Sequence, residues 1–161
     1  MKKRIHVLFA PIVVFVLLLC GCGRLSAEEY YDQLRAGLNE YSATLKEFDT
    51  VRTDVQSSQD IMLEQTKATQ ICERAEKALD KFKEMNPPKE YSEKHEALVE
   101  SAEHEKEFVR ATKKVLTART PAELSEYTSE VQAVLSGVPE EKQFASVFKD
   151  IVLELKNELG K

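Results

Sequence analysis

The stretch IMLEQTKATQICERAEKALDKFKEMNPP, residues 61–88, decides the fold of this 161-residue chain. It ends in Asn86-Pro87-Pro88, which stops a helix because the residue before a proline avoids the helical region and proline has no N–H to donate. Before that end, apolar side chains recur at the three- and four-residue spacing of one face of an α-helix: Ile61, Ala68, Ile71, Ala75, Ala78, Phe82 and Met85. The stretch therefore predicts an amphipathic helix with a defined end.

A second amphipathic helix is predicted before this one. Ser26-Ala27-Glu28-Glu29 has the form of a capping box, in which two side chains satisfy free backbone N–H groups at a helix start. One apolar stripe follows: Leu34, Leu38, Tyr41, Leu45 and Phe48. It does not continue in phase into the next stripe, so we expect a turn near Asp54 to Asp60 with Ser57 or Ser58 as the cap. The alternative is one long helix over residues 27–86 with a phase slip.

Three more helices are predicted after the prolines. The first of these helices is expected to have an inner face that Phe108 and Val115 flank. The residues of that face are Tyr91, His95, Leu98, Ala102, Val109, Thr112 and Leu116. Thr120-Pro121-Ala122-Glu123 is a second capping box, with proline at the first helical position. It opens a short helix that ends at Gly137 and directs four side chains inward: Leu124, Tyr127, Val131 and Val134. Pro139 opens the last helix, with one apolar face: Phe144, Phe148, Ile151, Leu155 and Leu159.

These patterns together predict the fold class. No segment alternates in the manner of a strand, and the connections between the helices are short, which makes sequential helices antiparallel neighbours. We expect residues 27–161 to form a single all-α domain, an elongated antiparallel helical bundle of four to five helices.

The amino terminus has the pattern of an export signal. Lys2 to Arg4 are basic, and Ile5 to Leu19 form an apolar run that is short of the ~20 residues of a membrane-spanning helix. Pro11 interrupts that run, so a permanent transmembrane helix is the weaker interpretation. The sequence Leu19-Cys20-Gly21-Cys22 resembles the lipobox of bacterial lipoproteins, in which a small residue precedes the cysteine that receives the lipid.

The resemblance implies processing and location. Residues 1–21 would be a signal peptide removed by cleavage between Gly21 and Cys22, and Cys22 would carry a diacylglyceryl group, with or without an N-acyl chain. Cys20 fits less well, because Leu19 would precede the cleaved bond. Residues 22–26 would form a tether to the outer face of a cytoplasmic membrane or to an outer membrane. Two or three acyl chains give stable anchoring.

Charge and cysteine content limit the functions of the remaining 140 residues. They hold 20 Lys and Arg against 28 Asp and Glu, a net charge of −8, so nucleic acid is not an expected partner. Cys72 would be the only thiol left after acylation of Cys22, and next to an apolar stripe it is expected to be a small buried hydrophobe rather than a nucleophile.

Two groups of polar residues are candidate sites. Tyr91 and His95 lie one helical turn apart and could stack or hydrogen-bond, in a structural or a ligand-sensing role. Residues 87–98, which contain this pair, resemble a proline-proline, aromatic, histidine pattern of small helical bacterial envelope proteins, which implies a bundle but no activity. Glu100, His104 and nearby acids share a helical ridge, but the Glu-x-x-His spacing of di-metal bundles is missing, so a solvated face is expected instead of a metal site.

The sequence favours a binding role. It contains no G-x-S-x-G, no H-E-x-x-H and no phosphate-binding glycine loop, so no enzymatic activity and no cofactor are expected. We expect a membrane-anchored helical bundle that acts as an interaction or structural module with an envelope protein partner. The alternative is a small-ligand sensor with a pocket between helices near Tyr91, His95 and Phe108.

Overall fold

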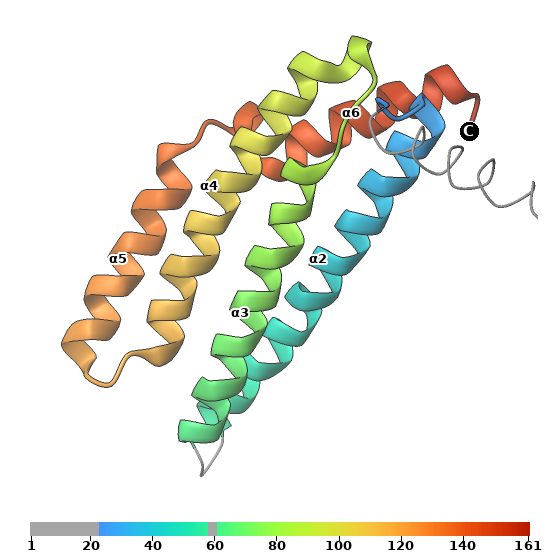
Figure 1. The fold of residues 1–161 in the computed structure, drawn as a ribbon. Coiled ribbons are helices and arrows are strands. Elements are labelled where there is room, and N and C mark those ends of the chain that lie inside the picture. Colours follow the sequence, from blue (N-terminus) through green and yellow to red (C-terminus); the bar gives the residue numbers. More distant parts are fainter. Residues whose placement is uncertain (1–22, 58–60) are drawn as a thin grey trace, which may run out of the picture.

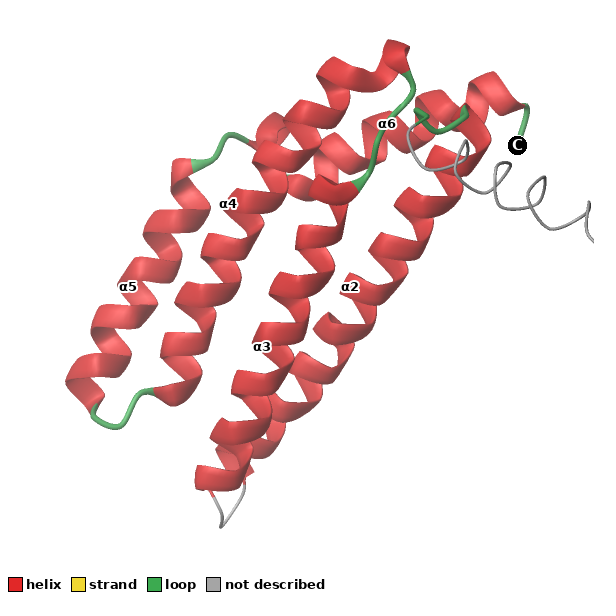
Figure 2. Cartoon of the chain, in the orientation of Figure 1, coloured by secondary structure: helices red, strands yellow, loops and turns green. Residues whose placement is uncertain are grey.

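The computed structural model describes residues 23–57 and 61–161, and these ranges consist of helices and loops without a strand. Figure 2 shows the helices joined by short loops. The predicted all-α bundle is thereby confirmed. The elements in chain order are α2 (Ala27–Ser57), α3 (Ile61–Glu84), the 3₁₀ turn η1 (Lys89–Tyr91), α4 (Ser92–Thr117), α5 (Pro121–Gly137), the 3₁₀ turn η2 (Glu140–Lys142) and α6 (Phe144–Leu159).

The three long helices α2, α3 and α4 run alternately up and down and pack against their neighbours in sequence (Figure 1). Because α2 ends at Ser57 and α3 returns along it from Ile61, the alternative of one continuous helix is wrong. Ser57 is the last residue of α2, so it does not cap α3, and Ser58 lies outside the described residues. Helix α5 lies beside α4, and α6 crosses the long helices near one end of the bundle (Figure 1).

Both predicted capping boxes are present. At the start of α2, the Ser26 N–H donates to the Glu29 carboxylate at 2.9 Å and the Glu29 N–H donates to Ser26 Oγ at 3.2 Å. At the start of α5, Thr120 and Glu123 exchange the same two bonds at 3.2 and 3.1 Å. The Pro87-Pro88 stop is also confirmed, since α3 ends at Glu84. These boundaries were predictable because each depends on residues adjacent in sequence.

The main core fills the end of the bundle that α6 crosses and extends along α3 as far as Cys72. Phe82 of α3 is fully buried there, and a Cβ added at Gly37 of α2 would lie only 3.0 Å from the Cζ atom of its ring. Glycine at position 37 therefore lets α2 approach α3 closely. This core contains members of every long helix and of α6: Tyr30, Tyr31, Leu34, Tyr41, Cys72, Ala75, Ala78, Leu79, Phe82, Tyr91, Leu98, Ala102, Val109, Phe144, Phe148, Ile151 and Leu155.

Helix α5 differs from its predicted role. None of its residues is buried, although Leu124, Tyr127, Val131 and Val134 were expected to point into the core, and Leu124 is 48% exposed. The physical reason is that α5 packs on α4 and leaves the rest of its apolar stripe without a neighbouring helix. Two smaller corrections concern Pro139, which precedes η2 while α6 begins only at Phe144, and Leu45, which is 39% exposed.

The predicted signal peptide, residues 1–21, and the lipidation residue Cys22 lie outside the described residues. Among the helices of the described ranges, none combines the length and apolarity that a membrane crossing requires.

Candidate functional site

Helices α2 and α4 form the two walls of a groove whose floor is α3. At the end that α6 crosses, this groove is filled. Phe144 and Phe148 of α6 reach down to Phe82 on the floor, with ring centroids 5.3 and 6.0 Å away, and Phe144 also meets Tyr41 of α2 edge-on at 5.7 Å. This half of the groove is therefore part of the main core.

The other half of the groove is not filled. Beyond Phe144, a cavity of about 280 Å³ lies over the α3 floor between α2 and α4. Apolar side chains dominate its lining: Thr44, Leu45, Phe48, Asp49, Ile71, Cys72, Ala75, Phe108, Val109 and Thr112. It adjoins a wider cavity of about 710 Å³ that shares Phe48, Phe108 and Thr112 and reaches across α4 to α5. The two cavities together are called the open groove below.

Helix α5 supplies the outer wall of the open groove. Leu124 and Leu135, which are 48% and 52% exposed, line the wider cavity together with the half-buried Val131. Residues from α4 form the surface between α5 and α2, among them Val115 and Leu116. The open groove thus presents side chains that are elsewhere buried in helical bundles.

The chemistry of the open groove is suited to binding and offers little for catalysis. Its charged lining residues are Asp49 and Arg119. Burial raises the pKa of Cys72 to about 11, so this thiol is neutral at physiological pH and a poor nucleophile. The predicted structural role of Cys72 as a buried hydrophobe is confirmed, since its side chain is 1% exposed.

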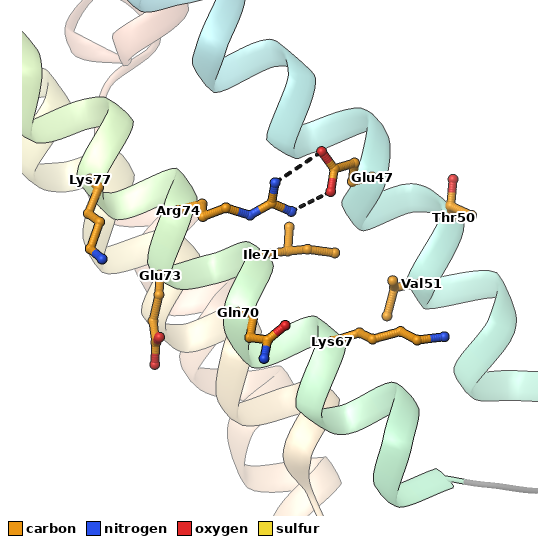
Figure 3. Close-up of a pocket in the computed structure, with 9 residues that line it drawn as sticks. All are labelled: Glu47, Thr50, Val51, Lys67, Gln70, Ile71, Glu73, Arg74 and Lys77. Atoms are coloured by element: carbon orange, nitrogen blue, oxygen red, sulfur yellow. Dashed lines mark hydrogen bonds and ion pairs between the residues drawn. The ribbon is translucent and has the colours of Figure 1, made fainter.

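A second cleft lies between α2 and α3 and has a different character. Figure 3 shows the Arg74 guanidinium directed at the Glu47 carboxylate across this cleft, whose volume is about 670 Å³. Lys67 on the same helix pairs with Glu64 at 2.7 Å. Because the exposed Arg74–Glu47 ion pair joins α2 to α3, we regard this cleft as a solvated contact between the two helices.

His95 and Tyr91, the predicted polar pair, bond to different partners. His95 is 6% exposed and its Nδ1 lies 2.9 Å from the hydroxyl of Tyr30, whose ring it meets edge-on. The Tyr91 hydroxyl donates to the carboxylate of Glu158 in α6 at 2.6 Å. Tyr30 was missed in the sequence, although it stands four residues before Leu34 on the predicted stripe of α2.

Burial sets the protonation state of this group. It lowers the pKa of His95, an effect that Glu96 partly offsets, and it raises the pKa of the Tyr30 hydroxyl. Both residues are therefore neutral near pH 7 and form a single hydrogen bond inside the main core. Of the three residues around which a pocket was expected, Tyr91 and His95 are buried and Phe108 lines the open groove.

The acids and histidine of α4 do not assemble a metal centre in the structure. His104 Nδ1 lies 3.8 Å from Glu107, one turn further along the helix. Within residues 23–57 and 61–161, no group of three or more His, Cys, Asp or Glu side chains is arranged to hold a metal ion.

Gly21 and Cys22, the predicted cleavage and lipidation residues, lie outside the described residues. Comparison of the chain with protein-family models, with curated proteins and with solved structures finds no match.

Proposed function

We propose that this protein is a lipid-anchored interaction module of the bacterial cell envelope, tethered through Cys22 on the extracytoplasmic side of a membrane. In this proposal the open groove holds an envelope protein partner. The observation that carries it is the row of apolar side chains that α2, α4 and α5 leave uncovered. Contiguous apolar surface of this kind costs solubility and, on a folded domain, marks a binding site.

The position of the groove agrees with an anchored role. The chain enters the bundle at the end that α6 crosses, where the Leu25 N–H donates to the Asn86 carbonyl at 2.9 Å. Phe48, on the wall of the open groove, lies 21 residues along α2 from Ala27, which is about 32 Å of helix. A lipid on Cys22 would hold the filled end near the membrane and present the open groove away from it.

A binding role is also favoured over an enzymatic one. The polar side chains of the open groove are few, and its thiol is neutral. Its titratable lining residues are Asp49, Cys72 and Arg119, a set with one carboxylate and no histidine for general acid and base work. We therefore propose that the protein is not an enzyme and needs no cofactor beyond the covalent lipid.

A small apolar ligand is the second candidate for the groove. Its two cavities, about 280 and 710 Å³, compare with the roughly 300 to 1,000 Å³ typical of small-molecule sites. A thermal-shift panel of lipids and apolar metabolites tests this candidate. A rise in Tm that disappears in Leu135→Glu would place the ligand in the groove and count against a protein partner.

The proposed function is tested by crosslinking in cells. Affinity-tagged wild-type chain is compared with Cys22→Ala, and intact mass of each purified bait reports acylation. We expect acylated wild type to crosslink to one envelope protein, and Cys22→Ala to lose both the lipid and the crosslink. Absence of acyl mass on wild-type Cys22 would overturn the anchor, and equal crosslinking by both baits would show that the anchor does not bring the partner.

A further inference from the structure

We propose that the bundle docks on the membrane that holds Cys22, through a basic and partly apolar face of α2 and α6 that meets anionic lipid headgroups. The inference rests on the proposed function, in which Cys22 carries the lipid. It states which side of the anchored domain lies on the membrane and which lipid charge that side selects.

The lipid anchor leaves the bundle almost no distance from the membrane. The Gly23 carbonyl accepts a hydrogen bond from Asn86 Nδ2 at 3.2 Å, and the Leu25 N–H donates to the Asn86 carbonyl at 2.9 Å. The chain is thus fastened to the turn between α3 and α4 from Gly23 onward. Cys22 is the preceding residue, and adjacent Cα atoms are about 3.8 Å apart. A lipid on Cys22 therefore brings the filled end against the headgroups.

An apolar cavity opens where α6 crosses α2. Its volume is about 480 Å³, and it is lined by Leu45 of α2 and Leu153 of α6, which are 39% and 47% exposed. The half-buried Leu38 and Val152 line it as well. Exposed apolar side chains of this kind enter the boundary between headgroups and acyl chains when a helix lies on a membrane. The α2–α6 face, as it is called below, consists of Leu38, Leu45, Lys149, Val152, Leu153 and Lys156.

Two lysines give the α2–α6 face its charge. Lys149 and Lys156 lie about two turns apart on α6, on either side of Leu153 in the sequence. Neither forms an ion pair with another residue of the described ranges. The acid that lines the same cavity is Glu105, which is half-buried and accepts from the Tyr41 hydroxyl. Lysines beside exposed leucines suit a lipid surface, because their stems cover apolar groups while their ammonium groups reach phosphates.

Helix α6 separates its charges by side. Its acids, Asp150, Glu154 and Glu158, follow one another at intervals of four and so share one side of the helix. Glu154 pairs with Lys94 of α4, and Glu158 accepts from the Tyr91 hydroxyl of η1. The acidic side of α6 is thus turned toward α4 and η1, whereas its two cavity-lining lysines lie beside α2.

The charges of α2 from Ala27 to Asp49 add no net acidity to this face. Glu29 belongs to the capping box, and Glu40 and Glu47 pair with cations of α3. The others, together with the C-terminal residue, are three cations and three acids: Arg35, Lys46 and Lys161 against Glu28, Asp32 and Asp49. The α2–α6 face therefore stays net positive, whereas residues 22–161 as a whole carry a net charge of −8.

This difference in charge selects the orientation of the domain. An anionic surface repels most of the domain and attracts the α2–α6 face, and each basic residue near such a surface favours contact by roughly 5-fold. A lipid on Cys22 fixes the position of the membrane next to Gly23, so the lipid surface is within reach of this face without any diffusing partner.

The test measures lipid contact at single positions of the acylated protein, purified from membranes and placed in vesicles. A fluorescent NBD probe is attached to Leu153→Cys on the α2–α6 face or to Leu135→Cys on α5, at leucines that are 47% and 52% exposed. Cys72 is 1% exposed, so the probe reacts with the introduced thiol. Phosphatidylcholine with a nitroxide-labelled acyl chain quenches a probe that touches lipid.

The lipid composition and the two positions give the expected result. In vesicles of equal parts phosphatidylcholine and phosphatidylglycerol, we expect quenching at position 153 to exceed that at position 135 by at least about 3-fold. In vesicles of phosphatidylcholine alone, the fraction of chains with this face on lipid should fall, because the attraction to anionic headgroups is lost. Equal quenching at the two positions, or quenching at position 153 that does not depend on phosphatidylglycerol, would overturn the inference.

Matched charge variants identify the groups that make the contact. Lys149→Gln/Lys156→Gln, made with the probe at position 153, is compared with Lys77→Gln/Lys114→Gln, which removes the same charge from exposed positions of α3 and α4. We expect the first pair to lower the fraction of chains with the face on lipid by roughly 5-fold per lysine and the second pair to leave it unchanged. Equal quenching of the two double variants would contradict the proposed contact.

Two further outcomes separate this inference from the proposed function. A blue-shifted probe at position 153 that lipid nitroxide does not quench would mean that protein, from a second copy or another chain, covers the face, and it would overturn the lipid contact. Acyl mass on Cys22 without lipid contact at position 153 would remove this inference and leave the anchored interaction module standing. Absence of acyl mass would remove both.

Discussion

The two halves of the groove between α2 and α4 have the same walls and the same floor and differ in what lies between them. In one half, Phe144 and Phe148 of α6 close the space over Phe82. In the other half, Phe48 and Phe108 face a cavity. The helices α2, α3 and α4 thus create one largely apolar surface, and the position of α6 decides which part of it becomes core.

Helix α5 explains why the second half stays open. It turns back at Thr120 and packs on α4, beside the groove instead of over it. Its leucines consequently form a wall with exposed side chains. If the two halves differ in this way, substitutions at the filled half should cost more folding stability than substitutions at the open half.

The largest effect on folding stability is expected from aromatic residues on either side of the boundary between the filled half and the open half of the groove. Phe82→Ala should lower the free energy of unfolding by about 3–5 kcal/mol, because it leaves a cavity under α6. Phe48→Ala, at a half-buried position on the open groove, should cost roughly half as much. Urea denaturation followed by circular dichroism measures both, and equal losses would show that the open half is as tightly packed as the filled half.

The next largest effect on folding stability is expected from the substitution of two glycines. Gly37→Val places a side chain against the ring of Phe82, where a Cβ alone comes within 3.0 Å, and should cost about 1–3 kcal/mol. Gly137→Val, at the end of α5 with no atom within 4 Å of the added Cβ, should change stability by no more than about 0.5 kcal/mol. Chemical denaturation of both variants checks the difference. Tolerance of Val at position 37 would contradict close packing of α2 on α3.

The buried His95 makes the filled half sensitive to acid. Its pKa is lowered in the folded protein from the usual 6.5, so below pH 6.5 the unfolded chain binds more protons and the free energy of unfolding falls. The slope from this residue cannot exceed about 1.4 kcal/mol per pH unit. Tm of wild type and His95→Gln is compared between pH 7.5 and 5.5. A wild-type loss no greater than that of His95→Gln would refute this explanation.

The smallest effect is expected on α5. Replacing Leu124 or Leu135 singly by Gln should change the free energy of unfolding by no more than about 0.5 kcal/mol, because both side chains are already half exposed to water. Leu98→Ala, at a fully buried position of the filled half, should cost about 2–5 kcal/mol in the same assay. Losses of that size on α5 would mean that the open groove is closed in solution.

Local signals explain how much of the fold the sequence predicted. Thr120 and Glu123 indicate a helix start because they form hydrogen bonds with each other's backbone. Pro87 indicates a helix end because it clashes with the helical conformation of the residue before it. The number of helices and their antiparallel order follow from such signals and from short loops. The crossing of α6 over the other helices could not be predicted, because it depends on contacts such as Phe144 with Tyr41 that join residues far apart in the chain.

The candidate site was harder to predict for a related reason. An apolar stripe shows which face of α5 avoids water, but not whether another helix covers it, so Leu124 was wrongly expected to be inside. His95 was correctly expected on the inner face of α4. Its partner Tyr30 could be identified only from the fold, which brings together residues 65 positions apart.

The approach of Lys161 to the first turn of α2 has a mechanical consequence. Lys161 pairs with Glu28 at 2.9 Å, so the C-terminus is fastened to the first turn of α2 at the filled end. A force applied between Gly23 and the open groove acts along the axes of α2 and α4. It loads the helix contacts in shear, where many must yield together, instead of peeling one helix away turn by turn. The bundle would in this way transmit force over about 46 Å, which is the length of the 31-residue α2.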